Sequence, residues 1–234
     1  MKPPLLLLPG LLCDDAVWHA QVTALSDRYD CRVVDYGALD SLAAMAEVAL
    51  AGTSGRFALA GHSMGGRVAF EILRRAPQRV SQLVVMDTGF LPRGQGEHGA
   101  REAAQRQQLV ALAYSHGMRS MGREWLRGMV PEQRWQDDEL IEAILAMVER
   151  KTPEIHAAQV RALLTRPDAS DVLPTIACPT LLLCGRDDQW SPLARHEQMA
   201  QLIPDARLGV IEEAGHMTTM ERPDQVNATL RAFL

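Results

Sequence analysis

Short apolar runs alternate with helical patterns along most of the chain. Between the runs, apolar residues recur at spacings of three and four, which is typical of helices packed on one face. Alternation of strands and helices predicts a parallel sheet covered on both faces. The sequence therefore predicts an α/β protein with a mostly parallel open sheet of about six strands flanked by helices. The expected strands are residues 5–8, 31–35, 57–60, 82–87, 180–184 and 207–211.

The helices expected between these strands have recognisable starts and stops. Asp40 or Ser41 can cap the second helix, and Pro77 ends the third. Ser191-Pro192 begins the helix after the fifth strand. The other expected helices are residues 15–26, 39–50, 64–75 and 223–234.

From about Phe90 to Asp171 the pattern changes to helical periodicity alone, with Thr152-Pro153 as one helix start. No strand is expected there. The sequence predicts an inserted helical cap over 90–171 and a core domain formed by 1–89 and 172–234.

Composition narrows the class of partner. The chain has 234 residues, 47% hydrophobic and 23% charged, with a formal net charge of −5. This is ordinary for one globular domain and argues against nucleic acid or an anionic membrane as partner. The apolar N-terminal run is interrupted by Pro9-Gly10 and is too short to span a membrane. We expect a cytoplasmic protein, and the sequence does not indicate its oligomeric state.

The four cysteines, Cys13, Cys31, Cys178 and Cys184, show neither metal-type spacing nor a dense disulfide pattern. We expect reduced thiols and no metal site. Cys13 lies near the candidate site described next, so sensitivity to thiol reagents is a further hypothesis.

The segment Gly61-His62-Ser63-Met64-Gly65 follows an apolar strand and opens a helix. A Gly-x-Ser-x-Gly turn in that setting is a nucleophile elbow, in which the serine hydroxyl is pushed out of the sheet edge. The helix also points its free amide groups toward whatever Ser63 attacks. Ser63 is therefore the candidate nucleophile.

A serine hydroxyl needs a neutral imidazole to take its proton and a carboxylate to orient that imidazole. In a parallel sheet, groups that converge lie at the carboxyl ends of strands. Of the seven histidines, His62 and His216 occupy such ends, and His62 must point away from its neighbour Ser63. We predict His216 as the base. Asp187, Asp188 and Asp87 also follow strands, and the residues alone do not decide among them.

An oxyanion hole needs two backbone donors. The N–H of Met64, directly after Ser63, is one candidate. The second is expected in the loop after the first strand, where Gly10 permits close backbone approach, and the Leu11 N–H is our choice.

These motifs together resemble the α/β-hydrolase superfamily, with a likeness to carboxylesterases that carry a helical cap. The order Ser63, Asp, His216 matches the family. Residues 185–192 resemble its Gly-x-x-Asp-x-x-x-Pro segment, which implies Asp188 as the acid. Gly215-His216 and the expected C-terminal helix also resemble the pattern of this superfamily. Two departures stand out: Pro9-Gly10 replaces the usual His-Gly, and the usual N-terminal hairpin is missing.

The predicted function is hydrolysis of carboxylic esters of small to medium size through an acyl-enzyme on Ser63, without metal or cofactor. An enol-lactonase, a carbon–carbon bond hydrolase or a thioesterase would use the same triad. A non-catalytic ligand-sensing protein of the same fold is the alternative of a different class.

Residues of the cap are expected to decide the substrate. In the cap, Arg119, Arg123 and Arg127 recur every four residues. Two interpretations are open: a solvated basic face, or a site for the carboxylate of a substrate. The large apolar side chains that pack the cap or line a pocket are Trp125, Trp135, Met118, Met121, Met129 and Met147.

Overall fold

Six parallel strands form a single sheet at the centre of the computed structural model, which describes residues 2–234. Their order across the sheet is β2-β1-β3-β4-β5-β6. The chain moves outward from β1 to β2 and then returns to β3, so the order reverses between β1 and β3. Such a switch point leaves a crevice at the carboxyl ends of the strands. The strands are β1 (Pro4–Leu8), β2 (Asp30–Val33), β3 (Phe57–His62), β4 (Val80–Met86), β5 (Thr180–Gly185) and β6 (Arg207–Ile211).

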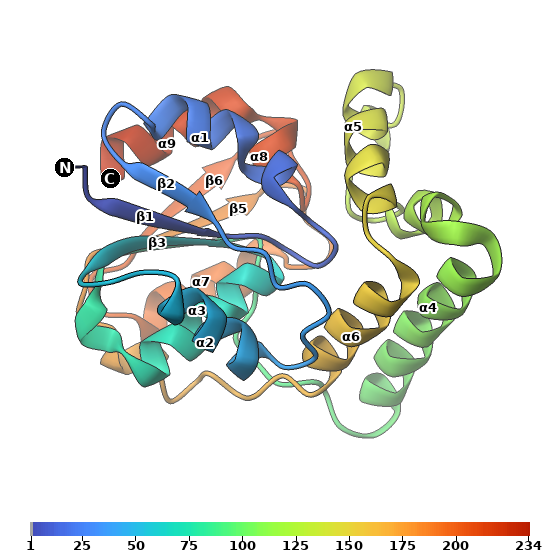
Figure 1. The fold of residues 1–234 in the computed structure, drawn as a ribbon, viewed down its shortest axis with the longest axis horizontal. Helices are drawn as coiled ribbons and strands as arrows, with labels where there is room; N and C mark the ends of the chain where they lie inside the picture. Colours follow the sequence, from blue (N-terminus) through green and yellow to red (C-terminus); the bar gives the residue numbers. More distant parts are fainter. Residues whose placement is uncertain (1) are drawn as a thin grey trace.

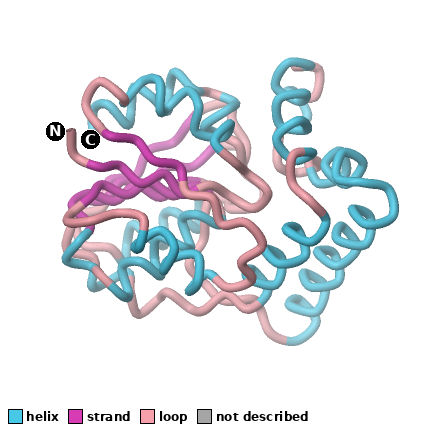
Figure 2. Tube along the Cα trace, in the orientation of Figure 1, coloured by secondary structure: helices cyan, strands magenta, loops and turns pink. Residues whose placement is uncertain are grey.

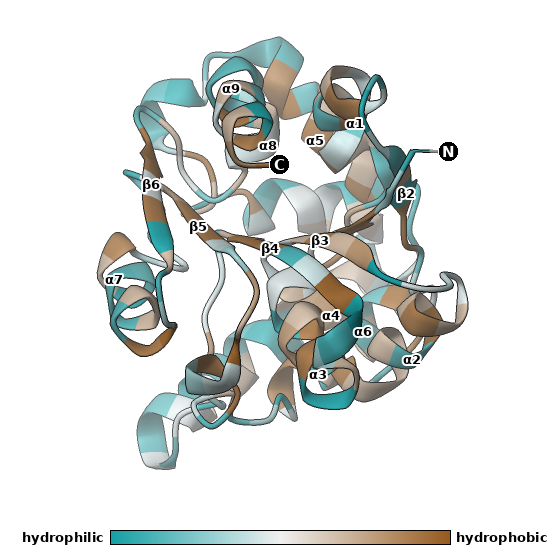
Figure 3. Cartoon of the chain, turned by 90° about the vertical axis from the view of Figure 1, so that its left-hand side faces the viewer, coloured by the Kyte–Doolittle hydropathy of each residue, from teal (hydrophilic) through white to brown (hydrophobic). Residues whose placement is uncertain are grey.

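Helices cover both faces of the sheet (Figures 1 and 3). One layer contains α1 and α9, which contact each other, together with the short α8; the other contains α2, α3 and α7. The helices of the two layers are α1 (His19–Leu25), α2 (Leu42–Ala51), α3 (Met64–Arg75), α7 (Leu193–Leu202), α8 (Thr218–Glu221) and α9 (Pro223–Phe233). Four short 3-10 helices are η1 (Asp15–Trp18), η2 (Pro77–Arg79), η3 (Glu132–Arg134) and η4 (Leu173–Thr175).

The burial of each strand follows its place in the sheet. Every residue of β3 and of β5 is buried, whereas β2, at one edge, alternates between exposed and half-buried positions. A strand covered on both faces has no polar side, which is why the central strands read as continuous apolar runs.

Residues 90–171 form helices and loops beside the carboxyl ends of the strands (Figures 1 and 2). Here α4 (Gly96–Trp125) contacts both α5 (Asp138–Glu149) and α6 (Pro153–Leu164). A backbone with φ 84° at Gly117 breaks α4 into two parts. We call this segment the helical insertion; its division from a core domain at residues 89/90 and 171/172 stays a prediction.

The predicted sheet and its order of elements are confirmed. The helix over 64–75 and the strand over 207–211 agree with the prediction to the residue. Ser41, rather than Asp40, caps α2, because its side chain accepts a hydrogen bond from the Ala44 N–H. Thr152 caps α6 in the same way. Of the other strand ends, Leu8, Phe57 and Thr180 also agree with the prediction, and the rest differ by one or two residues.

No helix among residues 2–234 is long and apolar enough to cross a bilayer. Separately, all four cysteines are free thiols, two of them buried and two half-buried.

Candidate active site

Ser63 lies between β3 and α3 in a strained backbone conformation, with φ 54° and ψ −115°. Strain of this kind costs on the order of 1–3 kcal/mol and persists where surrounding contacts impose it. Here the Ser63 N–H donates to the Met86 carbonyl at 2.9 Å, and the Gly66 N–H donates to the Ser63 carbonyl at 3.0 Å. The Thr88 hydroxyl donates to the same carbonyl at 2.7 Å. These three hydrogen bonds hold the turn.

The glycines on either side of Ser63 are required by close backbone approach. A Cβ on Gly61 would lie 2.5 Å from the Gly65 carbonyl oxygen. A Cβ on Gly65 would lie 2.0 Å from the Leu8 carbonyl oxygen. Both distances are far shorter than a van der Waals contact, so this turn excludes any larger residue at either position.

Ser63, His216 and Asp188 form one line of hydrogen bonds. The Ser63 hydroxyl is 2.8 Å from His216 Nε2, and His216 Nδ1 is 2.9 Å from Asp188 Oδ2. Because the carboxylate can accept only, Nδ1 carries the proton and Nε2 accepts from the hydroxyl. Both His216 and Asp188 are buried, and Ser63 is half-buried. This arrangement can take the hydroxyl proton as the oxygen attacks an electrophilic carbon.

The loop after β5 positions Asp188 through its own backbone. Asp188 Oδ1 accepts hydrogen bonds from the N–H groups of Trp190 and Ser191, both at 2.8 Å. This leaves Oδ2 for His216. The neighbouring Asp187 is exposed and extends to solvent.

The third acid considered from the sequence, Asp87, is buried close to this line but is engaged elsewhere. Its Oδ1 accepts from the Gly185 N–H at 3.0 Å, and its Oδ2 contacts the Thr218 hydroxyl at 2.5 Å. Burial, followed by the charge of Asp188, raises the pKa of Asp87 well above its usual range.

The loop that carries His216 is fixed from two directions. The Glu221 carboxylate accepts hydrogen bonds from the N–H groups of Gly215 and Met217, on either side of His216. The His216 N–H donates to the Met129 carbonyl at 2.7 Å, a contact from the helical insertion. This role of Glu221 has no signal in the sequence, because it appears only when α8 folds back on the loop.

The charges around His216 favour its protonated form. Burial by itself would lower the pKa of His216, but the charge and hydrogen bond of Asp188, followed by the charges of Asp87 and Glu221, raise it above its ordinary value. Burial would raise the pKa of Asp188, but His216 first and then the donated backbone hydrogen bonds lower it. An imidazolium formed during reaction would therefore be stabilised where it forms.

His62 points away from Ser63, as expected, and its side chain contacts the backbone of His216. Its Nε2 lies 2.7 Å from the His216 carbonyl oxygen, so that nitrogen carries the proton and donates. The side chain is buried, and burial first lowers the pKa of His62 to about 4. The imidazole is therefore neutral at pH 7. The adjacency of His62 to Ser63 in the sequence gave no signal of this contact.

The loop after β1 lies against the elbow. A Cβ on Gly10 would be 3.0 Å from His62 Nδ1 and 3.2 Å from Ser63 Cβ. Among residues 2–234, neither the Leu11 N–H nor the Met64 N–H donates to another protein group. Within the described residues both predicted oxyanion donors are therefore unpaired; Met64 follows Ser63, and Leu11 follows Gly10, which lies against Ser63.

Two tryptophans extend from the base toward the helical insertion. The Trp190 ring lies 5.4 Å from the His216 ring, and the Trp125 ring lies 5.7 Å from that of Trp190, measured between centroids. Trp125 is buried, as are the four methionines expected in the cap, whereas Trp135 is 38% exposed.

Burial raises the pKa of the Cys13 thiol to about 12, which disfavours its reactive thiolate.

The predicted basic face of the insertion is largely neutralised. Arg119 pairs with Glu142 and Glu149, and Arg127 pairs with Glu124 at 3.4 Å. These pairs favour the solvated-face interpretation over a carboxylate receiver.

One group of side chains has metal-ligand types. Atoms of Asp87, Cys184 and Asp188 lie within 4.8 Å of one another. However, Asp188 already accepts three hydrogen bonds and Asp87 two, and burial raises the pKa of the Cys184 thiol. This group fits the support of His216 better than it fits an ion.

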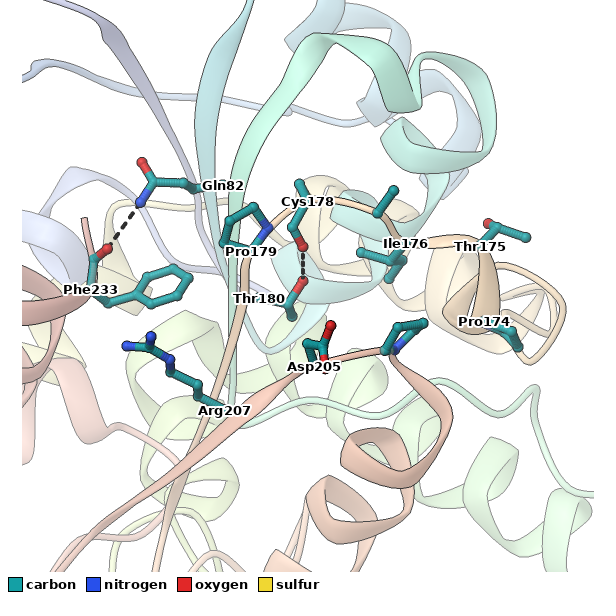
Figure 4. A pocket seen from close by; sticks show the side chains of 12 residues that line it. Gln82, Pro174, Thr175, Ile176, Cys178, Pro179, Thr180, Asp205, Arg207 and Phe233 are labelled. Atoms are coloured by element: carbon teal, nitrogen blue, oxygen red, sulfur yellow. Dashed lines mark hydrogen bonds between the residues drawn. The ribbon is translucent and has the colours of Figure 1, made fainter.

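A separate cavity of about 690 Å³ lies at the amino ends of β4, β5 and β6 (Figure 4). Gln82, Thr180 and Arg207 line it, and Gln82 donates to the Phe233 carbonyl at 2.9 Å. Ser63 lies at the opposite ends of the strands, so this cavity is not part of the candidate site.

Comparison with known proteins agrees with the fold. Residues 5–229 match the model of the alpha/beta hydrolase family. A pimeloyl-[acyl-carrier protein] methyl ester esterase of Nitrosomonas europaea is 29% identical, over 95% of this chain and 92% of that one. A 2-hydroxy-6-oxo-6-phenylhexa-2,4-dienoate hydrolase of Comamonas testosteroni is 28% identical over 75% of this chain and 62% of its own length. The structure of a thermophilic esterase from Thermogutta terrifontis superposes with a TM-score of 0.86 at 30% identity, covering 99% of this chain and 89% of that one.

Proposed function

The chain belongs to the alpha/beta hydrolase family, and from that membership we propose that it is a serine esterase that cleaves small to medium carboxylic esters through an acyl-enzyme on Ser63. The observation that carries the proposal is the line of hydrogen bonds from Ser63 through His216 to Asp188, at 2.8 and 2.9 Å. The strained turn at Ser63 supports it, because it holds the hydroxyl at the end of a strand where a substrate can meet it.

In the first step, the Ser63 oxygen attacks the ester carbonyl while His216 Nε2 takes the hydroxyl proton. His216 then gives that proton to the departing alkoxide, and an alcohol leaves. In the second step, His216 takes a proton from water, the resulting hydroxide attacks the acyl-enzyme, and the acid is released as Ser63 regains its proton. Asp188 keeps the imidazole oriented and stabilises its charged form throughout.

The negative charge on the carbonyl oxygen needs donors during both steps. We propose the N–H groups of Leu11 and Met64 for this role. Their lack of other partners among residues 2–234 supports the proposal, because donors already engaged would have to break a hydrogen bond first.

The relatives leave a second candidate for the bond that is cleaved. The Comamonas testosteroni relative acts on a named keto acid rather than an ester. The triad geometry serves that reaction class and lactone or thioester hydrolysis equally well. The Nitrosomonas europaea and Thermogutta terrifontis proteins, both esterases by name, favour the ester.

A hydrolysis panel tests the proposal. Methyl and nitrophenyl esters of increasing acyl length, lactones, thioesters and vinylogous diketones would be offered to the wild type and to Ser63→Ala. We expect ester turnover that Ser63→Ala lowers at least about a thousandfold. Turnover of lactones or diketones with little ester cleavage would favour the second candidate. Failure of Ser63 to react with a fluorophosphonate probe would favour a non-catalytic ligand-sensing protein.

A further inference from the structure

Two arginine side chains meet at the root of the helical insertion. Arg67 lies on the first turns of α3, and Arg195 lies on α7. Arg67 Nη2 and Arg195 Nη1 both lie within 3.1 Å of the point where a Cβ on Gly89 would stand. Because Gly89 has no side chain, both guanidinium groups can approach this one place.

Among residues 2–234, neither guanidinium group of this pair forms an ion pair with a carboxylate. Arg67 Nη1 donates to the Leu91 carbonyl at 2.9 Å, and Arg195 Nη1 donates to the Trp190 carbonyl at 3.2 Å. In the part of the chain that the structure describes, their remaining N–H groups have no protein acceptor. Both residues are half-buried, so part of each is accessible to solvent.

The surroundings of the pair add to its positive charge. Arg106 and Arg166 stand nearby and share one carboxylate, that of Glu102, at 3.0 and 2.8 Å. Burial first, and then the charges of Arg166, Arg195 and Arg106, lower the pKa of Arg67 well below its usual range. A guanidinium group does not lose its proton in a protein, so the repulsion is retained in the folded state. An anion placed between the two groups would relieve it.

We propose that Arg67 and Arg195 form a binding site for one carboxylate or phosphate group. Planar guanidinium groups donate paired hydrogen bonds that match the oxygens of such anions. Gly89 directly follows Thr88, whose hydroxyl holds the Ser63 carbonyl, so the site adjoins the nucleophile elbow. The anion is either the free carboxylate of an ester substrate or a separate small anion. The first source rests on the proposed function, and the second does not.

Inorganic phosphate tests the site without requiring activity. The melting temperature would be measured against phosphate at constant ionic strength, balanced with chloride, because salt alone screens the repulsion. We expect a saturable rise for the wild type, since a ligand that binds the folded state stabilises it. Arg67→Gln and Arg195→Gln should abolish the rise. Arg56→Gln, which removes an exposed arginine at the amino end of β3, should keep it.

Two results would overturn the proposal: no rise in the wild type beyond the chloride control, or an equal rise in both variants. Arg67 also holds the Leu91 carbonyl, so its replacement removes a contact of the insertion. Arg195→Gln keeps the test decisive if Arg67→Gln does not fold.

Paired substrates identify the source of the anion. The monomethyl ester of a dicarboxylic acid would be compared with its dimethyl ester. If the substrate carries the anion, both variants lower kcat/KM for the monoester about tenfold or more beyond any loss for the diester. If the anion is free, phosphate and the variants affect the two esters equally or not at all. If neither ester is hydrolysed, the proposed function fails while the phosphate measurement still decides the site.

Discussion

The backbone N–H of His216 donates a hydrogen bond to the carbonyl of Met129 at 2.7 Å. Met129 belongs to the helical insertion, whereas His216 follows β6, so the segment that covers the site also holds the proposed base. A Cβ on Gly215 would lie 2.4 Å from the same Met129 oxygen. The insertion and the loop of His216 therefore pack at backbone contact.

Gly215→Ala is expected to push this contact apart. The added methyl group meets backbone on Met129 rather than a flexible side chain, so the His216 loop must move. Because small displacements of a catalytic group are costly, we expect kcat to fall about tenfold or more. Steady-state kinetics on an ester measures this. Gly52→Ala is the control, since its Cβ would meet its nearest neighbour at an ordinary 3.6 Å, and it should keep full activity. Equal activity of the two variants would contradict the prediction.

The three candidate acids should differ sharply when each is changed to asparagine. Asp188→Asn loses the acceptor for the His216 Nδ1 proton, and we expect kcat to fall on the order of 10³–10⁴-fold. Asp187→Asn changes an exposed residue and should leave kcat within about twofold of the wild type. Asp87→Asn affects only a supporting group and should give an intermediate loss. A similar kcat for the Asp187 and Asp188 variants would refute the assignment.

The pH dependence of kcat/KM should reflect the raised pKa of His216. The imidazole must be neutral to take a proton, so activity is lost as the pH falls through this pKa. Since Asp188 and the other carboxylates outweigh burial, we expect the midpoint above the ordinary value of about 6.5. A rate profile from pH 5 to 9 with a neutral ester measures it. A midpoint below 6.5 would show that burial lowers the pKa of His216 by more than the carboxylates raise it.

Sequence patterns predicted the fold well because its signals are local. The helix from Met64 to Arg75 is bounded by the elbow and by Pro77, and the continuous apolar run of β5 follows from burial on both faces. Strand ends are less well predicted by pattern, since β2 begins one residue earlier and ends two residues earlier than expected. Hydrogen bonds to β1, rather than side-chain pattern, decide where that edge strand ends.

The supporting contacts of the candidate site could not be predicted in the same way. In the sequence, nothing distinguishes Glu221 from other acidic residues. Its role depends on α8, which brings its carboxylate to the N–H groups of Gly215 and Met217. The choice of Asp188 over Asp187 depended on resemblance, because adjacent carboxylates differ only in loop geometry. The contact between His62 and the His216 carbonyl joins residues 154 apart in the chain, and no local pattern encodes it.

Acid should destabilise the fold through its buried histidines. Burial is the first cause that lowers the pKa of His62, His156 and His196 to about 4. In the unfolded chain these groups bind protons near pH 6.5, so the unfolded state gains protons first as the pH falls. The free energy of unfolding should therefore decrease from pH 6.5 toward 4. Each histidine contributes about 1.4 kcal/mol for each unit by which its pKa differs between the folded and unfolded states.

His156→Leu isolates the contribution of one histidine that lies outside the Ser63, His216 and Asp188 hydrogen bonds. On α6, His156 Nδ1 is buried and has no hydrogen-bond partner among residues 2–234, so leucine removes a titrating group and an unpaired polar atom together. Urea midpoints measured between pH 4 and 7 should show a flatter dependence for this variant. An unchanged slope would mean that His156 titrates normally in the folded protein.

The strain at Ser63 should appear as a difference between two inactive variants. With φ 54° and ψ −115°, this position suits glycine and disfavours every residue that has a Cβ. Ser63→Ala keeps the strain, whereas Ser63→Gly relieves it. Relief of about 1–3 kcal/mol outweighs the roughly 0.4–1 kcal/mol of entropy that a glycine adds to the unfolded state. Urea unfolding should therefore find Ser63→Gly the more stable of the two.

Ser54 provides the control. It is an exposed residue without positive φ, so the same pair of substitutions there should show no advantage for glycine. An alanine variant at least as stable as the glycine variant at Ser63 would mean that the elbow stores no strain for the reaction to use.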